Sequence, residues 1–208
     1  PTRRLPKPQP DGDKEEDSPK IPNELIVTLK PNSGIDIAEL AKKLGAEIVD
    51  EIEGLDIYRL RFENEQQTEK AQTLLEQNKG VASVDNNFGI TPPDTLSPVG
   101  LKPPPLNLRP ASADKDGIVI GLIDSSVQRE GSRVGDFLLP EISIAGEAAN
   151  RPDQLTHGTS MAETILRGLS ASLEDTQETS VRILPVDVYG QSENTSTFAV
   201  ARGVQAAI

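Results

Sequence analysis

The sequence predicts an α/β protein made of two units: a small one with the element order βαββαβ, and the first part of a larger one with a parallel sheet. Three observations carry this prediction. Apolar residues alternate or recur at helical spacing through residues 22–91, and seven prolines follow within residues 92–116. From residue 117 onward apolar residues run together, as they do in strands buried on both faces of a parallel sheet.

Two segments are predicted to lie outside these units. In residues 1–21 prolines mix with charges of both signs and large aliphatic residues are scarce, so little apolar surface is available to offset the entropy of ordering. We therefore expect a disordered arm there. Residues 92–116 are expected to form a semi-rigid, extended linker because of their prolines.

The small unit, residues 22–91, is built from short periodic segments. Strands are expected at 24–29, 46–52, 55–62 and 81–90, and helices at 35–44 and 65–79. Gly45 and Gly80 suit the ends of the two helices, and Glu53-Gly54 suits a hairpin turn. This order predicts a ferredoxin-like arrangement, an antiparallel sheet with both helices on one face.

The larger unit, residues 117–208, is expected to alternate strand and helix. Strands are predicted at 118–124 and 181–189, and helices at 156–167 and 197–208. Thr156 suits an N-cap and Gly168 a C-terminal stop. No stop signal follows the last helix, so we expect the domain to be incomplete at Ile208.

Charge and composition narrow the classes of function. The net charge of -12 makes a nucleic-acid partner unexpected, because such a surface repels phosphate. No apolar run reaches the ~20 residues that span a bilayer, and residues 1–20 hold no apolar core of a signal peptide. The chain has no cysteine, which excludes disulfides and thiolate chemistry but fits either side of a membrane.

Two residues are candidates for chemistry, Asp124 and His157. Asp124 closes an apolar strand, at the edge where open parallel sheets place their sites. His157 is the only histidine and begins a helix in the string THGTSMA, where Gly158 allows close approach to the ring. Taken singly, an aspartate after a strand is most often a turn or cap residue, and a lone histidine is most often structural.

Three segments together resemble the subtilisin-like serine proteases: GLIDSS at 121–126, HGTSMA at 157–162, and ILPVDVYGQSENTSTFAVARGVQAAI at 183–208. The family's order is aspartate, histidine, serine, with roughly 32 residues between the first two. Here the two residues are 33 apart. Residues 22–91 resemble the family's inhibitory propeptide, which has the same βαββαβ order, and VASVDNNFGI at 81–90 resembles its last strand.

The resemblance implies a serine endopeptidase that is made as a zymogen, processes itself and is secreted or periplasmic. Asp124 would hold the imidazole of His157 in the right tautomer, and His157 would take the proton of the catalytic serine. That serine would lie at roughly position 314, so the implied partner is the C-terminal half of the catalytic domain, and the chain alone would be inactive. The propeptide would block the cleft, with residues 86–95 near both catalytic residues, and peptides or proteins would be the substrates.

The resemblance assigns substrate binding to Glu193, Asn194 and Thr195, along which an extended peptide would pair as an added strand. The family often has small residues there, so Glu193 indicates either a preference for basic peptides or a solvated loop carboxylate. No cofactor is expected, and the calcium-binding loop of some family members is not evident in residues 167–180. That segment holds three acids, which either bind a cation or are only solvated: Glu174, Asp175 and Glu178.

Three alternatives stay open. Ser160 is a rival nucleophile, because GTSMA at 158–162 also resembles the motif around the family's serine, but Glu163-Thr164 follow where a proline is expected. The protein is alternatively non-catalytic, either a degenerate protease or a propeptide-type inhibitor that binds another enzyme. Lastly, two unrelated α/β modules joined by a linker would make no mutual contact and would unfold independently.

Overall fold

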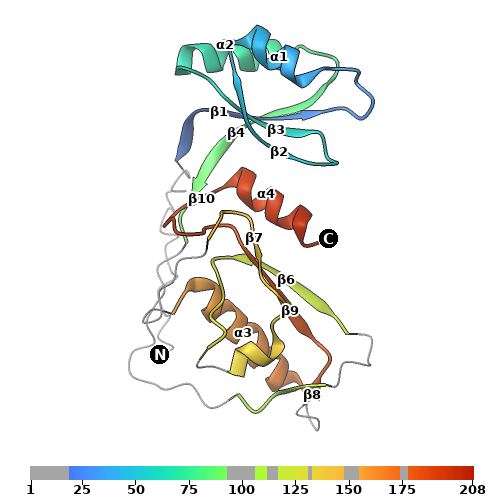
Figure 1. The fold of residues 1–208 in the computed structure, drawn as a ribbon, viewed down its shortest axis with the longest axis vertical. Coiled ribbons are helices and arrows are strands. Elements are labelled where there is room, and N and C mark those ends of the chain that lie inside the picture. The colour runs from blue at the N-terminus through green and yellow to red at the C-terminus, as the bar shows by residue number, and fades with distance from the viewer. Residues whose placement is uncertain (1–18, 93–105, 112–116, 131–132, 148–154, 174–177) are drawn as a thin grey trace, which may run out of the picture.

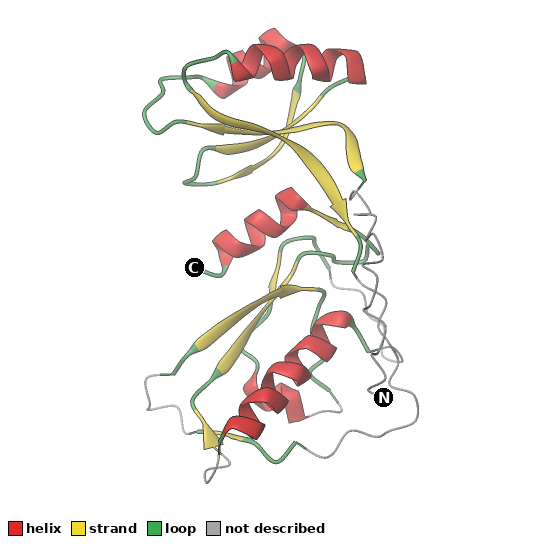
Figure 2. Ribbon diagram, turned by 180° about the vertical axis from the view of Figure 1, so that it is seen from behind, coloured by secondary structure: helices red, strands yellow, loops and turns green. Residues whose placement is uncertain are grey.

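The computed structural model describes residues 19–92, 106–111, 117–130, 133–147, 155–173 and 178–208. These residues form two units that lie one above the other in Figure 1, with helix α4 (Thr197–Ala206) between the two sheets. Figure 2 shows the same stacking from behind.

The first unit is a four-stranded antiparallel sheet with two helices on one face (Figure 1). Its elements follow the predicted βαββαβ order: β1 (Lys20–Leu29), α1 (Ile37–Leu44), β2 (Glu47–Ile52), β3 (Ile57–Arg61), α2 (Glu65–Glu76) and β4 (Val81–Ile90). Strand β1 lies between β4 and β3, and β2 lies beyond β3. The core of this unit is apolar and includes Leu25, Val27, Leu60, Phe62, Ala71 and Leu75.

Local capping sets the helix boundaries of this unit. Asp36 caps α1 by accepting a hydrogen bond from the Glu39 amide at 3.1 Å. Asn64 caps α2 in the same way, through the Gln67 amide at 3.0 Å. Gly45 ends α1 with a φ of 70°, a left-handed conformation that glycine adopts without strain, so the predicted stop is confirmed.

Three predicted boundaries in this unit are wrong. Strand β1 begins at Lys20 because that residue pairs with Phe88 beyond an irregularity in the ladder, so the end of the segment 1–21 belongs to the sheet. Helix α2 ends at Glu76, before the predicted position 79. The turn between β2 and β3 spans residues 53–56 and is longer than the two-residue turn that we expected.

The second unit contains a parallel sheet in the order β6-β9-β7, which confirms the predicted class of sheet. Its elements are β5 (Arg109–Pro110), β6 (Val119–Asp124), the 3-10 helix η1 (Arg133–Phe137), β7 (Ile142–Ser143), α3 (His157–Ser172), β8 (Glu178–Thr179), β9 (Arg182–Asp187), β10 (Thr195–Ser196) and α4. Helix α3 packs against one face of the sheet, where Leu166 joins Ile183 in a buried cluster. Helix α4 packs on the other face, where Gly203 lies against Ile123 and Val186.

Two predictions for this unit need correction. Helix α3 continues through Gly168 to Ser172, because Gly168 has open space around it and Leu169 still packs against the core. The strand that ends at Asp124 is not buried on both faces. In the part of the chain that the structure describes, β6 is an edge strand. Its first residue, Val119, is 53% exposed, and Ile118 just before it is 66% exposed.

Part of the predicted linker, 92–116, packs with the second unit. Residues 93–105 and 112–116 of that prediction lie outside the described residues. Between them, β5 pairs in parallel with β8, and Leu108 is buried in the second core. The sequence did not indicate this because a strand of this length leaves no periodic pattern.

The two units share one edge of a sheet. Strand β10 of the second unit pairs antiparallel with the end of β4, so that Thr195 lies opposite Ile90 and Ser196 opposite Gly89. The hypothesis of two unrelated modules predicted no mutual contact. This pairing contradicts it.

Candidate active site

Two elements of the second unit deliver Asp124 and His157 to the same edge of the parallel sheet. Asp124 is the last residue of β6 and is buried, and His157 is the first residue of α3. Thr156 caps α3 by accepting the Thr159 amide at 3.2 Å, as the sequence predicted. The cap fixes where the helix begins and therefore where the imidazole lies.

The two candidate side chains are in direct contact. Nδ1 of His157 lies 2.8 Å from Oδ2 and 2.9 Å from Oδ1 of Asp124. A carboxylate only accepts hydrogen bonds, so Nδ1 carries the proton in this contact and Nε2 is the bare nitrogen of the neutral imidazole. Among the described residues, no hydrogen bond reaches Nε2. The pair can therefore accept a proton at Nε2 while the carboxylate stabilises the imidazolium that results.

The loop after β6 orients the carboxylate. Oδ1 of Asp124 accepts hydrogen bonds from the backbone amide of Ser125 at 2.6 Å and from its hydroxyl at 3.2 Å. The same hydroxyl oxygen accepts the Gly158 amide at 3.0 Å. A Cβ on Gly158 would lie 2.0 Å from the Ser125 carbonyl oxygen, so only glycine allows the helix to approach this closely.

A second set of bonds holds this loop to the start of α3. The Thr156 hydroxyl donates to the Ser126 carbonyl at 2.6 Å, and the Thr159 hydroxyl accepts the Gln128 amide at 2.9 Å. The Ser126 hydroxyl donates to the Glu141 carboxylate at 3.0 Å. This bond gives the side chain of Ser126 a role in fixing the loop.

Ser160, the rival nucleophile, lies one turn into α3. Its hydroxyl donates to the Thr156 carbonyl at 3.3 Å, a bond within its own helix. No hydrogen bond joins Ser160 to His157 among the described residues. Glu163, a departure from the family pattern, forms an ion pair with Arg167 at 3.7 Å on the same helix.

The predicted substrate segment lies beside the end of the first unit. Thr195 belongs to β10 and pairs with Ile90. Asn194 accepts a hydrogen bond from the Thr91 hydroxyl at 2.7 Å, whereas Glu193 is exposed. The structure therefore brings Asn194 and Thr195 into contact with the end of β4, but not Glu193.

Tyr189 lies near both the predicted substrate segment and Asp124. It lines a cavity of about 620 Å³ between the two units, together with Thr91 and Asn194. Burial raises the pKa of Tyr189, and the charge of Asp124 raises that pKa further. Tyr189 therefore lies near both the end of β4 and Asp124. Of the predicted blocking segment 86–95, residues 93–95 lie outside the described residues.

Comparison with known proteins supports the resemblance. Residues 8–87 match the family model of the fervidolysin N-terminal prodomain. The whole fold is similar to the crystal structure of fervidolysin from Fervidobacterium pennivorans, a keratinolytic enzyme related to subtilisin, with a TM-score of 0.60 at 12% identity. That match covers 92% of this chain and 34% of fervidolysin. The chain therefore shares its fold with a protease related to subtilisin.

The fold has a second match in the epidermin leader peptide processing serine protease from Staphylococcus aureus, with a TM-score of 0.54 at 13% identity. This match covers 88% of the present chain and 47% of that protease. The chain thus spans about a third of the length of one solved structure and about half of the other. No curated protein matches it.

Two residues of the candidate site, Glu141 and Tyr189, were not predicted from the sequence. Glu141 lies 15 residues after the serine that it contacts, in a stretch without periodicity, so no local pattern indicates it. Tyr189 follows the end of β9, which pairs with β6 so that Asp187 lies opposite Asp124. Its position after a neighbouring parallel strand was the signal that could have identified it.

The described residues give no indication of a metal site. They contain no group of three or more histidine, cysteine, aspartate or glutamate residues that could hold an ion. Of the acids considered for calcium, Glu174 and Asp175 lie outside the described residues, and Glu178 begins β8. Among the helices that the structure describes, none is long and apolar enough to cross a membrane.

Proposed function

We propose that this chain is the propeptide and the aspartate–histidine half of a subtilisin-like serine endopeptidase that acts on peptides or proteins. The observation that carries the proposal is the contact of His157 Nδ1 with both carboxylate oxygens of Asp124, at 2.8 and 2.9 Å. A serine hydroxyl needs a base within hydrogen-bond reach to become a nucleophile at neutral pH. His157 Nε2 is the atom that would supply that base.

In this proposal each member of the pair has a separate task. His157 Nε2 takes the proton of the attacking serine and later returns it to the leaving amine, while Asp124 keeps the proton on Nδ1 and stabilises the imidazolium. The serine belongs to the C-terminal half of the domain, which is the proposed partner. Ser160 is not the nucleophile, since its hydroxyl is bonded to its own helix.

The first unit would act as the inhibitory propeptide of this enzyme. Its sheet order β4-β1-β3-β2, with both helices on one face, supports the ferredoxin-like arrangement expected of it. Its last strand pairs with β10 at Thr195, and the Thr91 hydroxyl donates to Asn194, which supports the assignment of Asn194 and Thr195, but not of Glu193, to substrate binding. The end of β4 would then occupy the place of an extended substrate. A secreted or periplasmic location is part of the proposal.

The test combines mass measurement with an active-site probe. The natural protein that contains this chain is weighed intact under native and denaturing conditions, after treatment with a fluorophosphonate. We expect one serine outside this chain to be labelled, and His157→Ala to abolish labelling. Asp124→Asn should slow it by up to about 10⁴-fold, because the wrong tautomer then prevails. Ser160→Ala is the matched control and should label normally. Labelling of Ser160, or labelling that survives His157→Ala, would contradict the proposal.

A second candidate is a propeptide-type inhibitor or pseudoprotease that binds without cleaving. The observation that favours it is the extended contact of the first unit with β10 and α4. Absence of any labelled serine, together with inhibition of a separate subtilisin-like protease by this protein, would support this candidate instead.

A further inference from the structure

The pairing of β4 with β10, which joins the two units, is short enough to shift in register. Only two residue pairs form it, Ile90 with Thr195 and Gly89 with Ser196. Backbone hydrogen bonds carry no sequence information, and a shift by two residues would return every side chain to the same face of the sheet. The observed register must therefore be selected by side-chain contacts elsewhere.

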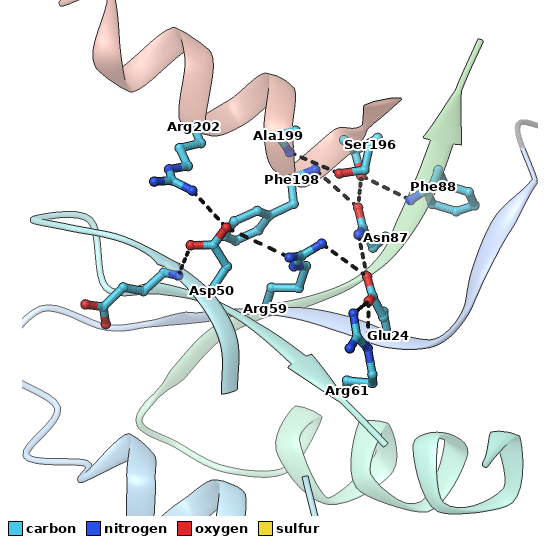
Figure 3. A network of polar contacts seen from close by, with 12 residues as sticks. Glu24, Asp50, Arg59, Arg61, Asn87, Phe88, Ser196, Phe198, Ala199 and Arg202 are labelled. Atoms are coloured by element: carbon cyan, nitrogen blue, oxygen red, sulfur yellow. Dashed lines mark hydrogen bonds and ion pairs between the residues drawn. The ribbon is translucent and has the colours of Figure 1, made fainter. Parts of the chain in front are cut away.

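Asn87 makes the contact that distinguishes one register from the next. Its side chain is completely buried, and its Oδ1 accepts hydrogen bonds from the Phe198 amide at 3.2 Å and the Thr197 hydroxyl at 3.0 Å (Figure 3). The Phe88 amide donates to the same hydroxyl oxygen at 3.1 Å. Helix α4 begins at Thr197, so Asn87 satisfies an amide in the first turn of that helix.

A hydrogen bond to Glu24 holds the side-chain amide of Asn87 in one orientation. Its Nδ2 donates to Oε2 of Glu24 at 2.8 Å, and Glu24 is a buried residue of the neighbouring strand β1 (Figure 3). The carboxylate accepts only, so the NH₂ group must face Glu24 and the oxygen must face α4. Arg61 donates to the other oxygen of Glu24, from Nη2 at 2.9 Å and from Nε at 3.1 Å, and keeps the carboxylate in place.

Two further contacts between the first unit and α4 also depend on how the two units are aligned. The guanidinium of Arg59 lies 5.4 Å from the centre of the Phe198 ring. Arg202, one turn further along the helix, donates to Asp50 at 2.9 Å. The pair of Arg202 and Asp50 is partly exposed, so it tolerates a shift of β4 better than a buried amide does.

We propose that Asn87, oriented by Glu24, fixes the register in which β4 pairs with β10 and thereby determines which residues of β4 lie beside the predicted substrate segment at Thr195. The inference rests on the proposed function, because it concerns how the propeptide occupies the substrate segment. Asn87 touches none of the reacting groups, so it is a positioning residue. If β4 moved by two residues, residues other than Ile90 and Gly89 would lie opposite Thr195 and Ser196.

Paired cysteines measure the register directly, because the natural chain has none. Directly opposed residues of an antiparallel pair lie within reach of a disulfide, whereas residues displaced by two positions are about 7–8 Å apart. The pair Ile90→Cys with Thr195→Cys reports the observed register. The pair Ile90→Cys with Glu193→Cys reports a register shifted by two residues. Each is oxidised in the full chain, and the disulfide yields are compared by mass.

With Asn87 intact, we expect the first pair to oxidise and the second to stay reduced. Asn87→Ala leaves the Phe198 amide without its buried acceptor, which should shift the ratio of the two disulfides about tenfold toward the displaced pair. Asn64→Ala is the control, since Asn64 also caps a helix but only within the first unit. An unchanged ratio in folded Asn87→Ala would overturn the inference.

A polarity swap tests the inference even if Asn87→Ala does not fold. Asn87→Asp alone places two carboxylates in contact and should lose the observed register. Adding Glu24→Gln returns a donor to that contact, retains one negative charge there, and should restore the first disulfide. Failure of the folded double variant to restore it would overturn the inference. None of these measurements involves hydrolysis, so their failure is distinct from the failure of a serine to take up the probe.

Discussion

At the level of single residues, Gly158 allows α3 to approach the loop that carries Asp124. A Cβ there would lie 2.0 Å from the Ser125 carbonyl oxygen, which is backbone and cannot move alone. We expect Gly158→Ala to lower the free energy of unfolding by about 1–3 kcal/mol or more, as overpacking does. Gly168→Ala is the control in the same helix. It meets no atom within 4 Å and should stabilise the chain by about 0.5–1 kcal/mol. Urea denaturation measures both, and equal effects would refute the close approach.

Tyr189 gives a prediction for the dependence of stability on pH. Burial first, and the charge of Asp124 second, raise its pKa above the ordinary value of 10.0. The folded chain therefore holds the phenol proton more tightly than the unfolded chain does. This stabilisation is complete below pH 10.0 and is lost as the pH rises through the raised pKa of the folded state.

Absorbance of the tyrosinate ion measures this effect. The chain has two tyrosines, so Tyr58→Phe leaves Tyr189 as the single reporter. Asp124→Asn in that background should lower the pKa of Tyr189 but leave it above the ordinary value, because burial remains. An unchanged titration in Asp124→Asn would show that the carboxylate does not act on the ring.

The sequence indicated Asp124 and His157 as candidates but not the residues whose contacts hold the surrounding structure in place. Asp124 and His157 were identified because each ends or begins an element within a motif that the sequence displays. The contact of Ser126 with Glu141 depends on how a loop folds back, and no short-range pattern encodes it. The same is true of Asn87, whose partners on α4 are more than 100 residues away along the chain.

At the level of elements, the segment 106–111 should behave as part of the second unit. Leu108 is 1% exposed in a cluster with Phe137 and Leu166. Leu108→Ala should lower the free energy of unfolding by about 2–5 kcal/mol, as a cavity in a core does. Leu55→Ala, at a position that is 43% exposed, is the control and should change it by less than about 0.5 kcal/mol. If chemical denaturation shows no change in the free energy of unfolding for Leu108→Ala, the segment is only a linker.

Element boundaries that depend on neighbouring residues were predicted well, and boundaries that depend on distant parts of the chain were not. The end of α1 at Gly45 was predictable because a left-handed cap is a local property of glycine. The continuation of α3 past Gly168 was not, since packing of Leu169 against the core outweighs the weak helix propensity of one glycine. The start of β1 at Lys20 depends on a partner in β4 and was likewise hidden from the sequence.

At the level of the whole molecule, the two units should open together at their shared edge. Phe198 is 1% exposed and lies beneath Arg59 of the first unit. We expect Phe198→Ala to increase hydrogen exchange in the peptide 86–92, because the contact between α4 and β4 is lost. Val204→Ala, on the same helix at a position that is 48% exposed, is the control and should leave that peptide protected. If neither Phe198→Ala nor Val204→Ala alters hydrogen exchange in 86–92, the two units are independent.

The central claim is that Asp124 holds His157 ready to act as a base, and the imidazole itself reports on it most directly. His157 is the only histidine, so nitrogen NMR of isotope-labelled histidine yields a single ring without assignment. Since Nδ1 faces both oxygens of Asp124, we predict that the neutral ring carries its proton on Nδ1 and that Asp124→Asn abolishes this preference. A neutral ring protonated on Nε2, or one that exchanges between the two forms as free histidine does, would contradict the account.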